Sequence, residues 1–125
     1  TKISTDASTA TWSPDGRLLA FQHEEHGLRQ IWVAPAGGGE ARPITKGTQE
    51  LSHPQWSARH PDRILVVVNH KNLATVSVST GELTPLTRFD DSTRYVDYPS
   101  WSPDGTRVYF SMTRKVGDLF LLETR

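Results

Sequence analysis

The chain has no cysteine and no long apolar run. Without cysteine the fold contains no disulfide and no cysteine-ligated zinc, which fits a reducing cytosol as well as a periplasm where the domain needs no covalent cross-link. The longest apolar run, 64–68, is far shorter than the roughly 20 residues that a membrane-spanning helix requires. The sequence therefore predicts neither a disulfide-stabilised scaffold nor a transmembrane segment.

An excess of charge of either sign is also missing. The 125 residues carry 14 basic and 14 acidic side chains, a balance that gives no sequence-independent affinity for a phosphate backbone. Nucleic acid is therefore not an expected partner. Sustained helical periodicity is missing as well, and 8 prolines with 9 glycines interrupt short apolar stretches. These absences favour an all-β fold.

The chain does contain one sequence motif that is repeated about every 45 residues. Trp12 and Trp101 are each followed by Ser-Pro-Asp-Gly, whereas Trp56 begins a longer version with Ser-Ala-Arg-His before Pro61 and with Arg63 in place of the glycine. Proline fixes φ, aspartate bonds nearby amides and glycine accepts a positive φ, so the phrase predicts a hairpin turn. The predicted structural residues of the repeat are Trp12, Asp15, Gly16, Trp56, Asp62, Trp101, Asp104 and Gly105.

Each turn is followed by a stretch with the pattern of a strand. Leu19 and Phe21 after the first turn correspond to Val108 and Phe110 after the third, with the period of two that strands show. In the second repeat the run 64–68 is apolar at every position, as expected of a strand whose two faces are both covered.

A third strand and an outer strand complete each unit. The third strand is expected at 31–34, 73–76 and 119–122. Pro-Ile-Thr at 43–45 and Pro-Leu-Thr at 85–87 predict an outer edge strand, since proline cannot donate to an inner ladder. The prediction is one domain, 1–125, of three antiparallel four-stranded repeats, the last lacking its outer strand, at 8–45, 52–87 and 97–125.

A sheet that is apolar on both faces must be covered on both sides, which radial stacking of sheets achieves. The Trp-Ser-Pro-Asp-Gly turn, the Phe-ended strand, Gly-Glu and Pro-Ile/Leu-Thr together resemble the WD40-like repeats of TolB-type β-propellers. The resemblance implies β-propeller blades of the six-bladed type, with the three tryptophans of the repeat packed between blades. Three blades do not close a ring, so the chain is expected either to be a fragment of a longer propeller or to form a homodimer that completes six blades.

In propellers, ligands dock where the loops entering the first strands and those joining the second and third strands share one face. The entering loops are expected at 2–9, 47–53 and 89–98, and the joining loops at 23–29, 69–72 and 113–117. Tyrosine, arginine and aspartate in the longest entering loop suit contact with a protein or a sugar, although a solvated loop with local pairs has the same composition. The predicted partner-binding residues are Glu50, His53, Arg94, Tyr95, Asp97 and Tyr98.

The sequence predicts neither a catalytic nor a metal-binding motif. His23-Glu24-Glu25-His26 holds metal-ligand residue types, but residues three apart on a hairpin have no fixed common face. His53-Pro54 is similar to a step found in oligogalacturonate lyases, whose histidines serve manganese. No Gly-x-Ser-x-Gly elbow and no phosphate-binding glycine loop occurs. The sequence therefore predicts no catalytic residue, no metal and no cofactor.

The resemblance implies a non-catalytic TolB-like scaffold of the bacterial envelope, periplasmic in location, that binds a protein partner through its channel-mouth loops. Two alternatives stay open, because similar blades serve several activities. One is the accessory propeller of a prolyl-oligopeptidase-type or tricorn-like hydrolase, and the other is an oligogalacturonate-lyase-like propeller.

Overall fold

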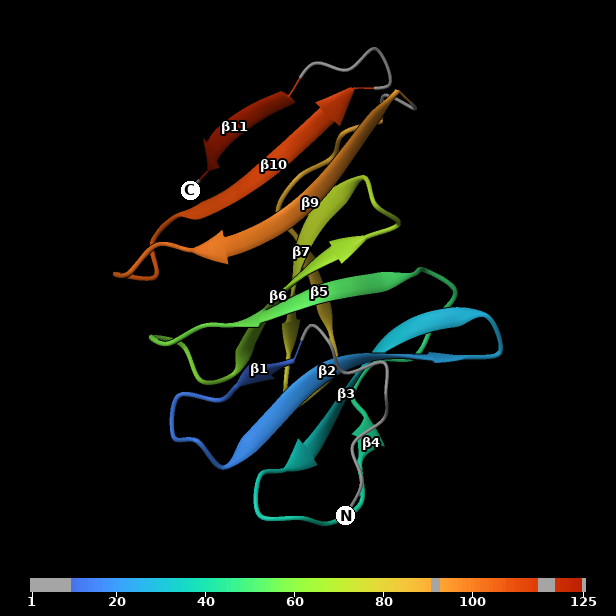
Figure 1. Ribbon diagram of the computed structural model, residues 1–125, viewed down its shortest axis with the longest axis vertical. Coiled ribbons are helices and arrows are strands. Elements are labelled where there is room, and N and C mark those ends of the chain that lie inside the picture. Colours follow the sequence, from blue (N-terminus) through green and yellow to red (C-terminus); the bar gives the residue numbers. More distant parts are fainter. Residues whose placement is uncertain (1–9, 91–92, 115–118, 125) are drawn as a thin grey trace.

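The computed structural model describes residues 10–90, 93–114 and 119–124, and these ranges contain strands and no helix. The strands form three antiparallel sheets that follow one another along the molecule (Figure 1). The first sheet consists of β1 (Thr11–Trp12), β2 (Leu18–Glu25), β3 (Leu28–Pro35) and β4 (Arg42–Pro43). The second consists of β5 (Leu51–Trp56), β6 (Arg63–Val68), β7 (Asn72–Ser77) and β8 (Leu83–Pro85), and the third of β9 (Arg94–Trp101), β10 (Val108–Arg114) and β11 (Leu119–Thr124). The prediction of antiparallel sheets in an all-β chain is confirmed.

Within each sheet, strands that are neighbours in sequence are also neighbours in space. The short strands β4 and β8 lie at the sheet edges, where Pro43 and Pro85 leave no inner hydrogen bond unmade. A threonine after each edge strand completes the attachment. Thr45 Oγ1 donates to Gln30 Oε1 at 2.7 Å and accepts from the Ile31 amide at 3.1 Å. Thr87 makes the same two bonds to Asn72 and Leu73.

The Ser-Pro-Asp-Gly turns of the first and third repeats have the same hydrogen bonds. Ser13 Oγ donates to Asp15 Oδ1 at 2.7 Å and accepts from the Leu18 amide at 3.0 Å. Ser102 Oγ bonds Asp104 and the Arg107 amide at the same distances. These hydroxyl and amide donors hold the pKa of each aspartate below its ordinary value, with the serine hydroxyl as the largest cause. The local motif therefore builds its own turn.

The second repeat turns differently, because the connection between Trp56 and its strand partner Ile64 is one residue longer than that between Trp12 and Leu19. Ser57 Oγ accepts hydrogen bonds from the amides of Arg59 and His60. Asp62 does not bond within this turn but accepts from the hydroxyls of Ser77 and Ser79, beyond β7. The hydrogen bond from Ser77 is the largest cause of the lowered pKa of Asp62; burial opposes it, and the bonds from Ser79 lower the pKa further.

The hydrophobic core lies between the sheets in two clusters. Ile64, Val66 and Val68 of β6 contribute to the cluster between the first and second sheets. Leu65 and Val67 of the same strand contribute to the cluster that the second sheet shares with the third. Both faces of β6 are thus dry, which explains why every residue of the run 64–68 is apolar.

The repeated tryptophans lie in different surroundings. The Trp56 side chain is buried, and its Nε1 donates to the Pro61 carbonyl at 2.8 Å. Trp101 packs against the second core cluster, and its Nε1 donates across the sheet boundary to the Gln55 carbonyl at 2.9 Å. Trp12 is 57% exposed. Among the described strands, none lies on the far side of the first sheet, so the inter-blade role of Trp12 stays a prediction.

Candidate functional site

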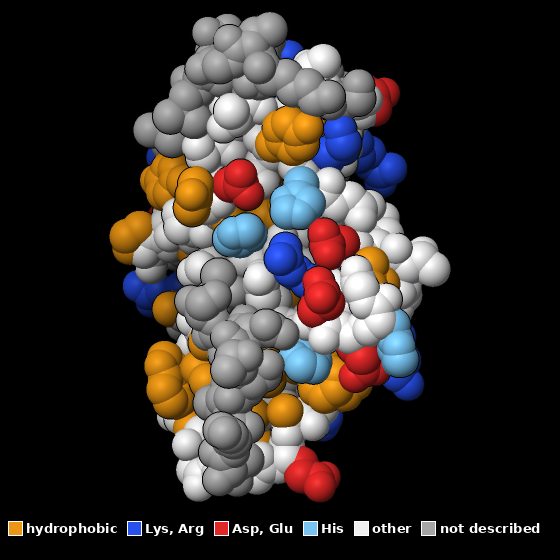
Figure 2. Space-filling view, turned by 45° about the vertical axis from the view of Figure 1, so that its right-hand side comes forward, with side chains coloured by type: hydrophobic (Ala, Val, Ile, Leu, Met, Phe, Trp, Pro, Cys, Tyr) orange, Lys and Arg blue, Asp and Glu red, His pale blue; other side chains and the backbone are white. Residues whose placement is uncertain are grey.

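One end of the three sheets brings together the starts of β5 and β9 and the hairpins that join β2 to β3 and β6 to β7. We call this end the loop face. It is the right-hand side of Figure 1, and Figure 2 turns it towards the viewer, with histidines and charged side chains of both signs gathered near the middle. The strands begin earlier than predicted: β5 includes His53, and β9 includes Arg94, Tyr95, Asp97 and Tyr98.

His53 and Tyr98 occupy corresponding positions in β5 and β9. Each precedes a proline, each has a φ of 53°, and each lies where the strand pairing shifts register. A non-glycine residue in this left-handed region is strained by roughly 1–3 kcal/mol, and such strain clusters at functional sites. The bulges bring the centres of the His53 and Tyr98 rings to 6.2 Å from each other in an edge-to-face arrangement. The amide of His53 is held by Gln22 Oε1 of the neighbouring sheet at 2.9 Å.

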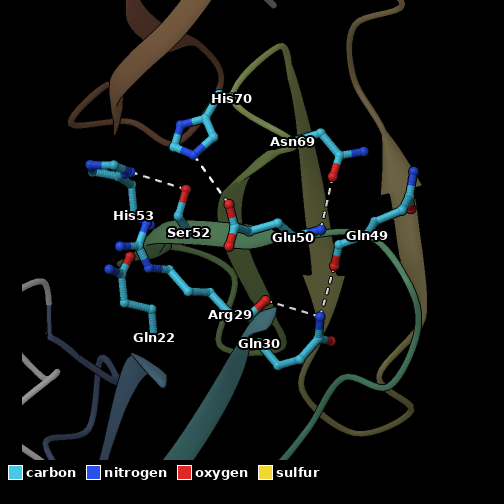
Figure 3. Close-up of polar contacts among 9 residues, drawn as sticks. All are labelled: Gln22, Arg29, Gln30, Gln49, Glu50, Ser52, His53, Asn69 and His70. Carbon is cyan, nitrogen blue, oxygen red and sulfur yellow. Dashed lines mark hydrogen bonds and ion pairs between the residues drawn. The ribbon is translucent and has the colours of Figure 1, made fainter. Parts of the chain in front are cut away.

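A second group of contacts surrounds Glu50, just before β5 (Figure 3). His70 Nε2 lies 3.2 Å from Glu50 Oε2. The Asn69 side chain accepts from the Glu50 amide at 2.8 Å, and the Asn69 amide donates to the Glu50 carbonyl at 2.8 Å. Asn69 and His70 both have a positive φ. The carbonyl of His70 also accepts from the Val96 amide, which ties this hairpin to the third sheet.

Arg29 reaches the same place from the first sheet. Its side chain is half-buried and extends from β3 towards Gln22 and His53 (Figure 3). Arg29, Glu50, His53, His70 and Tyr98 together are termed the loop-face cluster.

The environment of His53 favours its neutral imidazole. Burial lowers the pKa of His53 below its ordinary value of 6.5, Asp97 acts in the opposite direction, and the electrostatic influence of His70 and Arg29 lowers it further. His53 Nδ1 lies 3.1 Å from Ser52 Oγ. The imidazole therefore offers an aromatic surface and a hydrogen-bonding nitrogen rather than a charge.

The remaining predicted contact residues differ in accessibility. Tyr98 is 75% exposed and Tyr95 is 36% exposed, with Lys71 Nζ 5.8 Å from the centre of the Tyr95 ring. Asp97 is half-buried. Arg94 is half-buried too, and its Nη1 lies 3.8 Å from Met112 Sδ, on the core side of β9.

The structure adds residues that the sequence patterns did not single out as contact residues: Gln22, Arg29, Lys71 and His70. Their approach depends on how neighbouring sheets are stacked, for which the sequence holds no local signal.

His23 packs edge to face on Trp32 with ring centres 5.0 Å apart, and no group of three or more potential metal ligands occurs among the described residues. The described part also holds no helix long and apolar enough to cross a membrane.

Successive antiparallel sheets with dry faces and a polar, partly strained loop face define a segment of a β-propeller. Comparison with known proteins gives its family. Residues 1–124 match the TolB beta propeller domain, and the chain belongs to that family.

Similar proteins include a peptidase, TolB proteins and an oligogalacturonate lyase. The chain is 40% identical over 82 residues to the uncharacterized peptidase YuxL of Bacillus subtilis, covering 65% of the chain and 11% of YuxL. A putative TolB from Agrobacterium tumefaciens has a TM-score of 0.71 at 27% identity, over 91% of the chain and 40% of that protein. An oligogalacturonate lyase from Vibrio parahaemolyticus has a TM-score of 0.67 at 18% identity, over 85% of the chain and 28% of the lyase, which shows a shared fold alone. The chain thus spans well under half the length of each of these proteins.

Proposed function

We propose that the domain is a non-catalytic scaffold whose loop-face cluster binds a segment of a protein partner. The observation that carries the proposal is the side chain of Tyr98. It is 75% exposed, yet its backbone is held at a φ of 53° and its ring meets that of His53 on the neighbouring sheet. An exposed aromatic side chain on a strained, fixed backbone adds little to folding. Tyrosine is enriched in protein interfaces, where its ring gives area and its hydroxyl a hydrogen bond.

The rest of the cluster fits the same role. Arginine, histidine, glutamate and tyrosine side chains from three sheets converge on one face, so the recognition surface is mixed in charge and rests on rigid strands. The bulges at His53 and Tyr98 and the bonded pair Glu50–Asn69 fix the positions of these groups before a partner arrives. Preorganisation of this kind reduces the entropy lost on binding.

A second candidate is the accessory propeller of a larger hydrolase. It is favoured by the 40% identity with the peptidase YuxL. In such a protein the same surface would contact the peptide substrate or the catalytic domain. A periplasmic location and a lyase activity stay predictions from the family resemblance, and a homodimer that completes six blades stays a prediction from the number of repeats.

The proposal is tested with a phage-displayed random peptide library. Peptides selected on the wild-type protein are expected to bind the double variant His53→Ala/Tyr98→Ala at least about tenfold more weakly, since interface aromatic residues often contribute 2 kcal/mol or more. Tyr109→Ala is the matched control, because Tyr109 is 37% exposed but lies near the opposite end of β10. Peptides that bind all three proteins equally, or no selected peptide at all, would contradict the proposed site.

A further inference from the structure

Arg29 has no counter-ion among the described residues. The ion pairs that join two described residues connect His26 to Glu25 and His70 to Glu50. Glu24 lies opposite Arg29 in the pairing of β2 with β3, but its side chain is exposed and forms no ion pair with Arg29. Glu50 pairs with His70 instead, and Asp97 forms no ion pair with Arg29. A half-buried guanidinium without a partner loses hydration and gains no compensating contact, a situation that an incoming anion corrects.

A second donor lies beside the Arg29 guanidinium. Gln22 Oε1 accepts from the His53 amide at 2.9 Å. Because a backbone amide can only donate, the oxygen of the Gln22 side chain must face His53, and Nε2 points away as a donor. Gln22 Nε2 has no hydrogen-bond partner among the described residues. The guanidinium of Arg29 and the N–H donors of Gln22 Nε2 thus lie together at one edge of the loop-face cluster (Figure 3).

The chemistry of this edge matches a carboxylate. The guanidinium fork binds the two oxygens of a carboxylate in parallel, and an amide N–H adds a third hydrogen bond. The rings of His53 and Tyr98 next to it supply a surface for the carbon stem of a side chain or for a neighbouring residue. A polyanion is a poorer match, because the acids Glu50 and Asp97 lie on the same face and the chain as a whole is neutral.

We infer that Arg29, with Gln22, forms a subsite that binds a carboxylate of the partner peptide, either an acidic side chain or the carboxyl terminus. This inference rests on the proposed function, since it names the chemistry that the loop-face cluster recognises. Arg29 sets the charge preference, and the aromatic pair supplies contact area.

The test uses a peptide selected from the displayed library and a matched peptide in which each acidic residue is replaced by its amide, including an amidated carboxyl terminus. On the wild-type protein the amide peptide is expected to bind at least about tenfold more weakly. On Arg29→Gln the two peptides are expected to bind within about twofold of each other, and Arg29→Lys is expected to be intermediate because it keeps the charge and loses the fork. Arg42→Gln is the control for lost charge, since Arg42 lies near Pro14 and Asp15 at the opposite end of the sheets.

The outcomes separate this inference from the proposal beneath it. Peptides that depend on Tyr98 but not on their own acidic groups would overturn the carboxylate subsite and leave the binding site intact. Peptides that depend on neither would overturn the proposed function. Displacement of the peptide by inorganic phosphate much more readily than by acetate would overturn the assignment to a peptide carboxylate. The circular dichroism spectrum of each Arg29 variant is expected to match that of the wild type, which separates lost binding from lost folding. Arg29→Glu is expected to prefer a peptide whose acidic residue is replaced by lysine.

Discussion

Gly16 and Gly105 occupy the same place in two copies of the repeat, with φ angles of +72° and +73°. They differ in what lies beside them. Among the described residues, nothing is within 4 Å of a Cβ built at Gly16, whereas a Cβ at Gly105 would lie 2.9 Å from both Cβ and Cγ of Arg59. Arg59 belongs to the enlarged turn of the second repeat, and its Nε donates to the Pro103 carbonyl at 3.3 Å. The neighbouring turn therefore packs directly on Gly105.

Alanine at either position meets the same backbone strain, about 1–2 kcal/mol for a left-handed conformation. The gain from a less flexible unfolded chain, about 0.4–1 kcal/mol, offsets part of that loss equally in both variants. Gly105→Ala carries an additional loss of about 1–3 kcal/mol, because the stem of Arg59 is anchored near its own backbone and cannot swing aside as a side-chain tip would. The expected difference between the two variants is thus about 1–3 kcal/mol in the free energy of unfolding.

Urea unfolding followed by tryptophan fluorescence measures this difference. Arg59→Gly removes both atoms that the new methyl group would meet, so it is expected to recover most of the additional loss in Gly105→Ala and none of the loss in Gly16→Ala. Equal destabilisation by the two alanines, or additive effects of Arg59→Gly and Gly105→Ala, would refute the claim that the turns are in close contact.

Three further outcomes are expected. Hydrogen bonds from Ser102 and Thr106 hold the pKa of Asp104 far below its ordinary 3.8. The stabilising effect of this carboxylate is therefore complete above about pH 4 and is lost as the pH falls further. Between pH 5 and pH 2, the unfolding midpoint of Asp104→Ala should fall less steeply than that of the wild type. Trp101→Phe removes the bond to the Gln55 carbonyl and should lower the free energy of unfolding by about 1–3 kcal/mol in urea, whereas an unchanged value would deny that bond a role. Sedimentation should show a species of twice the chain mass if two copies complete a ring, and a monomer at high concentration contradicts the homodimer.

The strand order and the turns could be predicted from the sequence because their causes are local. Each Ser-Pro-Asp-Gly phrase forms its own hydrogen bonds, as Ser13 and Asp15 show, and proline marks the edge strands β4 and β8. The all-apolar run 64–68 similarly predicted a strand that is covered by other sheets on both faces.

The candidate site was predictable only in part. Tyr98 and His53 were predicted as contact residues from composition and position, and the structure places both on the loop face. The bulges that bring them together come from register shifts with no signature beyond the following proline. Arg29 was missed because its importance depends on Gln22 and His53 of two different sheets. Asp62 matched its counterparts in sequence, yet the longer turn moved it to Ser77 and Ser79. Contacts between sheets thus account for most of what local patterns left out.

Because both faces of β6 are buried, the second sheet belongs to two hydrophobic cores at once. Separation of the first or the third sheet from the second exposes one whole face of this strand to water, so losing one neighbouring sheet also weakens the packing of the other. The amides of β6 should accordingly be the slowest in the molecule to exchange with deuterium. Strain introduced in the first sheet should also destabilise the third sheet, because β6 packs against both.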